Sequence, residues 1–236
     1  MNKYAKNILR AYDNMLEDLE RLDNEGSTVR IDCTPAIATY ALPCAIYKIR
    51  EKYPNMNIHL NTNHSENIED GILNDNYDIG FVLKRPDDRD LIAHKVFEDD
   101  IVAVAPANLP LERCIEKEVL QKQNIILLNG STRLRELVDE KLTELGINKE
   151  RLKVIFELDS IESVKSTVLS GFGVSFLPYV SVKKELYTRQ LQRFEVKGYQ
   201  PRYEVYLVYK KENFSNNKEI KNFTDIFKQI GTKAFC

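Results

Sequence analysis

The sequence predicts an α/β protein that consists of two similar lobes preceded by one helix. Segments typical of strands and helices alternate from Thr28 onward, and this alternation comes as two successive series. Ahead of it, residues 1–25 have the apolar spacing of a single amphipathic helix. Repeated β-α units favour a mainly parallel sheet with helices on both faces, and two such series favour two lobes.

The N-terminal helix carries a narrow apolar seam. Its apolar residues are spaced alternately three and four apart over about three heptads, and Gly26 then ends the pattern. A lone helix of this kind is marginally stable, so it needs a partner. We expect residues 1–25 to form a linker and dimerisation helix, and packing against the rest of its own chain is the alternative. The seam residues are Ala5, Ile8, Tyr12, Met15, Leu19 and Leu22.

The first β-α series predicts the first lobe. Thr34 is a typical helix N-cap and Pro35 a typical first helical residue, so a strand at 29–33 is expected to pass into a helix that ends before Pro54. Further strands are expected at 57–62, 78–83, 92–97 and 101–105, with a helix at 65–73.

The second series predicts the second lobe. Asp159 and Glu162 have the spacing of a capping box, which predicts a helix over 159–170. Other helices are expected at 116–121, 131–145 and 217–230, and strands at 125–128, 154–158, 173–177 and 203–209. We expect the chain to cross between lobes near Pro106 and to return near Arg202. Lobe I then comprises 26–105 with 204–236, and lobe II comprises 106–203.

Composition argues against a dedicated nucleic-acid-binding or membrane protein. The chain has 34 basic and 36 acidic residues, whereas DNA binding normally needs a basic excess on one face. No apolar run approaches the ~18 residues of a membrane span, and the charged N-terminus does not resemble a secretion signal. We therefore expect a cytoplasmic protein. Its four scattered cysteines, Cys33, Cys44, Cys114 and Cys236, are then expected to be free thiols rather than two disulfides.

Three strand-to-helix turns, at 33–36, 129–132 and 158–161, are candidates for a ligand site. Each places small or hydroxyl-bearing residues at a helix N-terminus, where free N–H groups and the helix dipole favour an anion. Plain N-capping is the simpler interpretation of any one turn, and the carboxylate of Asp159 disfavours an anion at its own turn. Three turns that face one cleft between lobes would hold a small carboxylate, sulfate or phosphate group.

Two aromatic residues at strand ends have two interpretations. Phe81 and Phe176 either line that cleft or fill the core of their lobes, and the core is the simpler interpretation. Catalytic and cofactor motifs are missing, because the chain has no nucleotide-binding glycine pattern and no GxSxG. His59 and His64 lack the sequence context of a zinc site. We expect a protein that is not an enzyme and that has no metal and no cofactor.

The order and spacing of several short elements resemble the effector-binding domain of LysR-type transcriptional regulators. Residues 29–43 are similar to the family's opening strand and the helix that follows it with a Leu-Pro pair, here Leu42 and Pro43. The family's later elements have counterparts at Tyr53-Pro54, Asp78-Ile79-Gly80-Phe81, 102–110 and 171–178. The likeness spans about residues 28–230. Residues 1–25 resemble the family's linker helix, and the DNA-binding head is absent.

The resemblance implies two Rossmann-like lobes of the type 2 periplasmic-binding-protein kind. It also implies a small-molecule effector held between them, a homodimer or tetramer, and DNA contact only through a head domain absent from this chain. Ala36 stands where family members often have Ser or Thr, so one polar contact is lost there. The implied ligand-binding residues are Thr34, Ala36, Ile37, Phe81, Ser131, Thr132, Asp159, Ser160 and Phe176.

Two other functions stay open. A solute-binding protein of a transport system shares the two-lobed fold, although the missing export signal and the heptad helix disfavour it. An enzyme on a similar fold is disfavoured by the absence of a recognisable nucleophile, metal or nucleotide motif.

Overall fold

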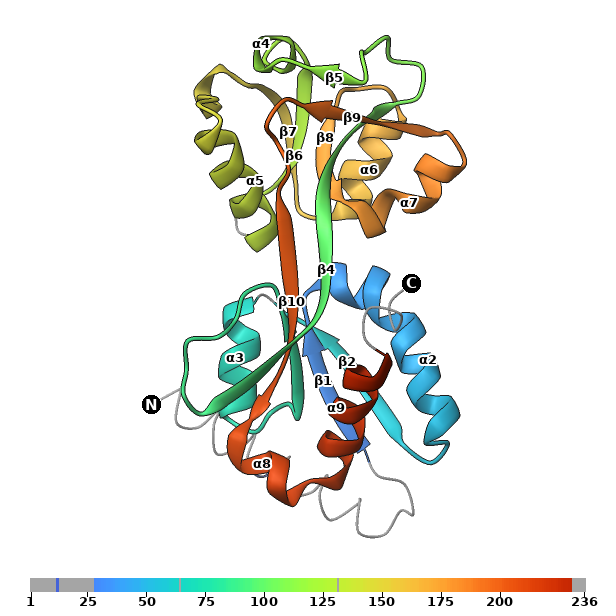
Figure 1. Cartoon of the computed structure of the whole chain (residues 1–236), viewed down its shortest axis with the longest axis vertical. Coiled ribbons are helices and arrows are strands. Elements are labelled where there is room, and N and C mark those ends of the chain that lie inside the picture. Colours follow the sequence, from blue (N-terminus) through green and yellow to red (C-terminus); the bar gives the residue numbers. More distant parts are fainter. Residues whose placement is uncertain (1–11, 13–27, 64, 131, 231–236) are drawn as a thin grey trace. The chain divides into compact units, whose positions relative to one another are not determined.

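The computed structural model describes residue 12 and residues 28–63, 65–130 and 132–230. These residues form two compact units (Figure 1). Unit 1 takes the chain up to Val96 and again from Tyr206 onward, and unit 2 takes Phe97–Val205. Two strands continue from one unit into the other, namely β4 (Leu91–Pro106) and β10 (Arg202–Lys210).

Unit 1 contains a mixed sheet with the strand order β2-β1-β3-β10-β4. The strands β1, β2 and β3 are parallel, and β10 runs antiparallel to β3. The strand bounds are β1 (Thr28–Cys33), β2 (Asn57–Thr62) and β3 (Ile79–Val82). The helices are η1 (Ile37–Ala41), α2 (Leu42–Lys52), α3 (Ser65–Leu73), α8 (Lys211–Asn216) and α9 (Lys218–Ile230).

Two neighbouring residues of β3 show which helices cover the two faces of this sheet. A Cβ on Gly80 would meet Ile68 and Ile72 of α3, whereas the ring of Phe81 contacts those of Phe223 and Phe227 of α9. Successive residues of a strand point to opposite faces, so α3 and α9 cover opposite faces of the sheet. Helix α2 contacts α9 and lies on the same side (Figure 1).

The helix that follows β1 is not the uninterrupted α-helix that was expected. Pro43 has no N–H to donate to the carbonyl of Thr39, and a proline ring clashes with the carbonyl four residues earlier. The chain therefore makes a wider π-helical turn, η1, in which the Leu42 N–H donates to the Ile37 carbonyl. Pro43 then lies in the first turn of α2, where a missing N–H is tolerated.

Unit 2 contains two groups of strands. In the first, β4 pairs antiparallel with β8 and β9, and β9 pairs parallel with β5. In the second, β6 pairs parallel with β7, and Val174 bridges to Ile125 of β6. The strand bounds are β5 (Cys114–Ile115), β6 (Asn124–Leu128), β7 (Lys153–Leu158), β8 (Ser175–Pro178) and β9 (Leu191–Val196). The helices are α4 (Lys117–Leu120), α5 (Arg133–Glu144), η2 (Lys149–Arg151), α6 (Ile161–Leu169) and α7 (Tyr179–Tyr187).

Two expectations about the strands are wrong. The predicted strands at 92–97 and 101–105 are one strand, β4, which continues through the acidic residues between them. Arg202 of β10 forms ion pairs with Glu98 and Asp100, and the buried Asp99 accepts hydrogen bonds from other elements. The sheets are also mixed rather than mainly parallel, because β4 and β10 run antiparallel to strands beside them.

The predicted dimerisation helix lies outside the described residues, apart from the exposed and helical Tyr12. Among the residues that the structure describes, no helix is long and apolar enough to cross a membrane.

The cysteines are not all free. Cys33 and Cys114 are free thiols, as expected. Cys44 is disulfide-bonded, so the expectation of a free thiol is wrong at this position.

Candidate functional site

The candidate turn of unit 1, at residues 33–36, contains Thr34, which joins β1 to the helix that follows. The residue is only 9% exposed, and its Oγ1 is buried without a hydrogen-bond partner in the described structure. The predicted capping bond is thus not made by this hydroxyl, and the Ala38 N–H instead donates to the Thr34 carbonyl at 3.0 Å. A buried hydroxyl left unpaired costs about 1–3 kcal/mol and calls for an explanation such as a binding role.

The other residues predicted in unit 1 lie close to this turn in the fold. Ala36 is half-buried and Ile37 is buried in the helical turn that follows Thr34. Phe81 is the register partner of Cys33 on the neighbouring strand β3. Its ring is fully buried against Phe223 and Phe227, at centroid distances of 6.4 and 5.3 Å. Phe81 therefore packs in the core behind the turn.

Asp32 is a residue of this region that the sequence interpretation missed. It is fully buried on β1, and the Asn63 amide donates to its Oδ2 at 2.8 Å. The same Asn63 nitrogen lies 3.3 Å from the Tyr77 hydroxyl. Burial raises the pKa of the Asp32 carboxyl, and the hydrogen bond from Asn63 offsets part of this rise. The signal available in the sequence was an acidic residue inside an otherwise apolar strand end.

In unit 2, strand pairing brings the second and third candidate turns to the same end of one sheet. Leu128 at the end of β6 pairs with Leu158 at the end of β7, and the Asn129 N–H donates to the Leu158 carbonyl at 2.8 Å. Thr132 caps α5 by accepting from the Arg135 N–H at 3.2 Å. Ser160 caps α6 by accepting from the Ser163 N–H at 3.1 Å. Two helix N-termini thus begin at the same end of this sheet, and a helix N-terminus favours an anion.

The capping box predicted at Asp159 and Glu162 is wrong by one residue. Ser160 is extended and is the N-cap, so α6 begins at Ile161, while Asp159 is exposed. Glu162 lies in the first turn of α6, and its Oε1 forms an ion pair with Lys165 at 2.9 Å. Ser131, predicted at the second turn, lies outside the described residues.

Arg135 holds the second turn in place. Its Nη1 donates to the Leu128 carbonyl and, at 2.8 Å, to Glu157 of β7, while its Nε donates to Asp139 at 3.0 Å. Burial alone lowers the pKa of Arg135, but its bonds to Glu157 and Asp139 raise it overall. One guanidinium therefore fixes α5 against both strands that carry the turns.

Phe176, the last predicted residue, is a buried side chain of β8. It pairs with Ala103 of β4, and its ring centroid lies 4.8 Å from that of Tyr199. The structure thus places Phe176 in the packing of unit 2.

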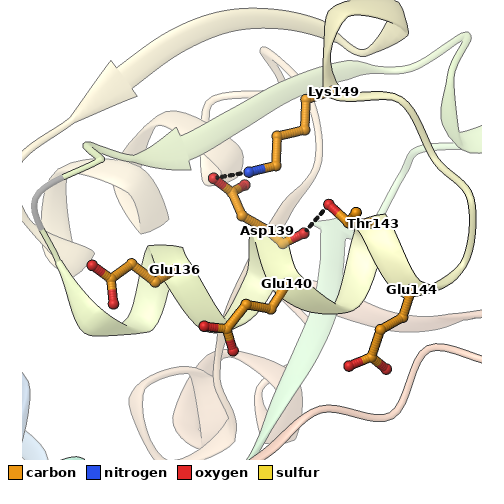
Figure 2. A pocket seen from close by; sticks show the side chains of 6 residues that line it. All are labelled: Glu136, Asp139, Glu140, Thr143, Glu144 and Lys149. Carbon is orange, nitrogen blue, oxygen red and sulfur yellow. Dashed lines mark hydrogen bonds and ion pairs between the residues drawn. The ribbon is translucent and has the colours of Figure 1, made fainter.

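A cavity of about 580 Å³ beside α5 is lined by Glu136, Asp139, Glu140, Thr143, Glu144 and Lys149 (Figure 2). Its carboxylates are paired: Asp139 with Lys149 at 2.9 Å, Glu144 with Lys141 at 2.7 Å, and Glu136 and Glu140 with Arg133. Within the described ranges, no group of three or more His, Cys, Asp or Glu side chains is placed to hold a metal ion. An acidic lining repels an anion, so this cavity does not fit the predicted ligand.

These α/β units, with helix N-termini at their strand ends, define a domain of the substrate-binding type. The chain belongs to the LysR substrate binding domain family, which matches residues 23–230. A probable RuBisCO transcriptional regulator of Cyanidium caldarium is 29% identical over 200 residues, which are 82% of this chain and 63% of that protein. One from Synechocystis sp. is 26% identical over 222 residues, 92% of this chain and 64% of that protein. The chain thus spans less than two thirds of these relatives.

Solved structures show the same fold. The Synechocystis CcmR regulatory domain in complex with 2-PG matches with a TM-score of 0.74 at 19% identity, over 87% of this chain and 97% of that one. The effector binding domain of QuiR in complex with shikimate matches with a TM-score of 0.74 at 16% identity, over 90% of this chain and 100% of that one. The predicted fold, of the type 2 periplasmic-binding-protein kind, is confirmed. The family is a binding domain and not an enzyme, as expected.

Proposed function

We propose that this chain is the ligand-sensing and oligomerising part of a LysR-type transcriptional regulator that acts in the cytoplasm. A small metabolite with an anionic group binds in the cleft between the two lobes, 26–105 with 204–236 and 106–203. Its binding controls transcription through a DNA-binding head domain that the 236 residues do not include. Membership of the LysR family and the regulators among its relatives support this proposal.

The observation that carries the proposal is the buried, unpartnered hydroxyl of Thr34 at the start of a helix. In unit 2 the helix N-termini at Thr132 and Ser160 favour a negatively charged group. Binding of small molecules by this fold has precedents in the complexes of CcmR with 2-PG and of QuiR with shikimate. The proposed contact residues are Thr34, Ala36, Ile37, Ser131, Thr132, Asp159 and Ser160, with Phe81 and Phe176 as apolar support.

The mechanism requires that the ligand prefer one arrangement of the two lobes. A ligand shifts an equilibrium only by its difference in affinity for the two states. A ligand that contacts turns of both lobes has such a difference in affinity, because it makes the contacts to the two lobes at the same time in only one of the two arrangements. The shifted arrangement then changes how a homodimer, or a tetramer of two dimers, presents its DNA-binding heads.

Ligand-dependent thermal unfolding of the full chain tests the proposal. A metabolite present at 100 times its Kd stabilises the folded protein by about 2.7 kcal/mol and raises the Tm. Thr34→Val keeps the side-chain shape and removes the hydroxyl. We expect this variant to bind the ligand about tenfold more weakly, while its unliganded stability is unchanged or higher by about 1 kcal/mol, because an unpaired buried hydroxyl is lost.

Thr224→Val is the matched control. Thr224 is also buried, and its Oγ1 also has no hydrogen-bond partner in the described structure, but it lies on α9. This control should match the stability change of Thr34→Val and bind the ligand like the wild type. Equal affinity of Thr34→Val and the wild type would contradict the proposed site.

A solute-binding protein of a transport system is the alternative function, because such proteins have the same fold. It is not favoured, because the relatives that match 82% and 92% of this chain are named as transcriptional regulators.

A further inference from the structure

The proposed site leaves one buried charge unexplained, the carboxyl group of Asp32. Asp32 is the register partner of Asn61 on β2 and of Gly80 on β3, so its side chain points to the α3 face of the sheet. The residue has no exposed surface. Oδ2 accepts the hydrogen bond from Asn63, whereas Oδ1 is buried and has no partner in the part of the chain that the structure describes.

The neighbouring groups do not neutralise this carboxylate. Arg30 precedes Asp32 by two residues and shares its face of β1, but its guanidinium binds Asp78, with Nη2 at 3.1 Å from Oδ1 and Nε at 3.3 Å from Oδ2. The other donors to this carboxylate, the Asn63 amide and the Cys33 N–H, are neutral, and the Asn63 bond is made to Oδ2. An ionised carboxylate that is buried with an unfilled oxygen is costly, so a donor is expected at Oδ1.

The unfilled oxygen of Asp32 is close in the chain to the unpartnered hydroxyl of Thr34. Both residues stand at the end of β1, and two residues of extended chain span about 7 Å. A small molecule of a few heavy atoms is long enough to span this distance. An ionised carboxylate can only accept hydrogen bonds, whereas a threonine hydroxyl donates or accepts. While Asp32 is ionised, the atom that fills its Oδ1 must therefore carry a proton.

We propose that Asp32 is a specificity-determining residue of the ligand site, and that it selects metabolites which present a hydroxyl or ammonium group to its Oδ1. This assignment rests on the proposed sensor function. The metabolite is then an acid that also carries a donor, such as a hydroxy acid or an amino acid, and not a bare inorganic anion or an unsubstituted carboxylate. Its anionic group lies away from Asp32, because like charges repel.

Matched acids test this specificity on the full 236-residue chain. Sets of small carboxylates that differ only at carbon 2, with an ammonium, hydroxyl, keto oxygen or hydrogen there, are titrated by calorimetry together with inorganic phosphate and sulfate. We expect the wild type to bind a donor-bearing acid at least tenfold more tightly than its donor-free counterparts. A comparison of the ammonium and hydroxyl forms identifies which donor is recognised.

Asp32→Asn removes the charge and keeps the shape. We expect this variant to lose the donor preference by about tenfold or more, with a larger loss for an ammonium than for a hydroxyl. Asp99→Asn makes the same change at a buried carboxylate of unit 2 and should keep the wild-type preference. The preference for donor-bearing acids is measured on the wild type alone, so the proposal can be tested even if Asp32→Asn does not fold.

Two results would overturn the assignment while leaving the sensor function intact. One is a donor-free acid or inorganic anion that binds the wild type as tightly as the donor-bearing acids. The other is an undiminished donor preference in folded Asp32→Asn. If no metabolite of any kind binds the wild type, the sensor function fails and this assignment fails with it.

Discussion

Single charged side chains fix the turns of unit 2, and Arg135 is the clearest case. Its side chain is only 11% exposed and reaches Leu128, Glu157 and Asp139 at once. Lysine has one ammonium group and cannot reproduce this fork of donors. We predict that Arg135→Lys lowers the free energy of unfolding by about 1–3 kcal/mol, measured by urea denaturation.

Arg133→Lys on the same helix is the control for this prediction. Arg133 pairs with Glu136 and Glu140, whose side chains are 54% and 56% exposed, and exposed pairs contribute little. Its replacement should change the stability by less than about 0.5 kcal/mol. Equal losses in the two variants would show that Arg135 does not hold the turn.

The buried Asp99 predicts a pH dependence of stability. Its carboxylate accepts from the Val180 N–H and the Tyr203 hydroxyl, each at 3.1 Å. Burial nevertheless raises its pKa above the ordinary 3.8, so the folded chain holds this proton more tightly than the unfolded chain. The contribution of Asp99 is fully present below pH 3.8 and is lost as the pH rises through the raised value.

The comparison of wild type with Asp99→Asn isolates this effect. We predict that the stability of the wild type, relative to the variant, falls as the pH rises across that window. Denaturant unfolding at a series of pH values measures the difference. A relative stability that rises with pH would mean that the two hydrogen bonds outweigh burial.

At the level of elements, Gly173 lies so close to β6 that a side chain at this position is expected to destabilise the fold. A Cβ on Gly173 would lie 2.9 Å from the backbone carbon of Asn124, next to the hydrogen bond that Val174 donates to the Asn124 carbonyl at 2.9 Å. The backbone cannot move aside as a flexible side chain can. We therefore predict that Gly173→Ala lowers the free energy of unfolding by about 1–3 kcal/mol, measured by thermal or urea denaturation. Gly130→Ala, with no atom within 4 Å of its Cβ, should cost nothing measurable.

Elements were predictable where local signals sufficed, and missed where distant partners decide the structure. Strands β1, β2, β6 and β7 and helix α3 follow from their own apolar patterns. Strand β4 was predicted as two strands, and its partner residue Arg202, which pairs with Glu98 and Asp100, lies about a hundred residues away in sequence. Helix α7 was missed because Pro178 was interpreted only as the end of a strand, although it is also the N-cap of α7. Strand β9 was missed although its burial partly alternates.

The candidate site was predictable to a similar degree. The turns at Thr34, Thr132 and Ser160 were identified from helix-start signals. The sequence could not reveal that the Thr34 hydroxyl is unpaired or that Asp32 is buried beside Asn63, since both depend on how β1 packs with β2, β3 and α3. A lone aspartate in a strand is a weak signal until its surroundings are known.

At the scale of the whole molecule, an exposed aromatic pair indicates a contact with another chain. The rings of Phe156 and Phe172 meet edge to face with centroids 6.2 Å apart, yet the residues are 43% and 53% exposed. Phe156 lies on β7, whose other edge has no strand beside it within the described residues. Exposed apolar groups at an open strand edge are typical of protein contacts.

We predict that a second copy of this chain covers this surface, so that light scattering finds a dimer. Phe156→Lys places a charge in the contact and should weaken dimerisation at least tenfold, since burying an unpaired ammonium costs well over 1.4 kcal/mol. Tyr187→Lys, at an 89% exposed position on α7, should leave the dimer unchanged. A dimer insensitive to Phe156→Lys would exclude this surface as the contact, and a monomer at every concentration would contradict the dimer itself.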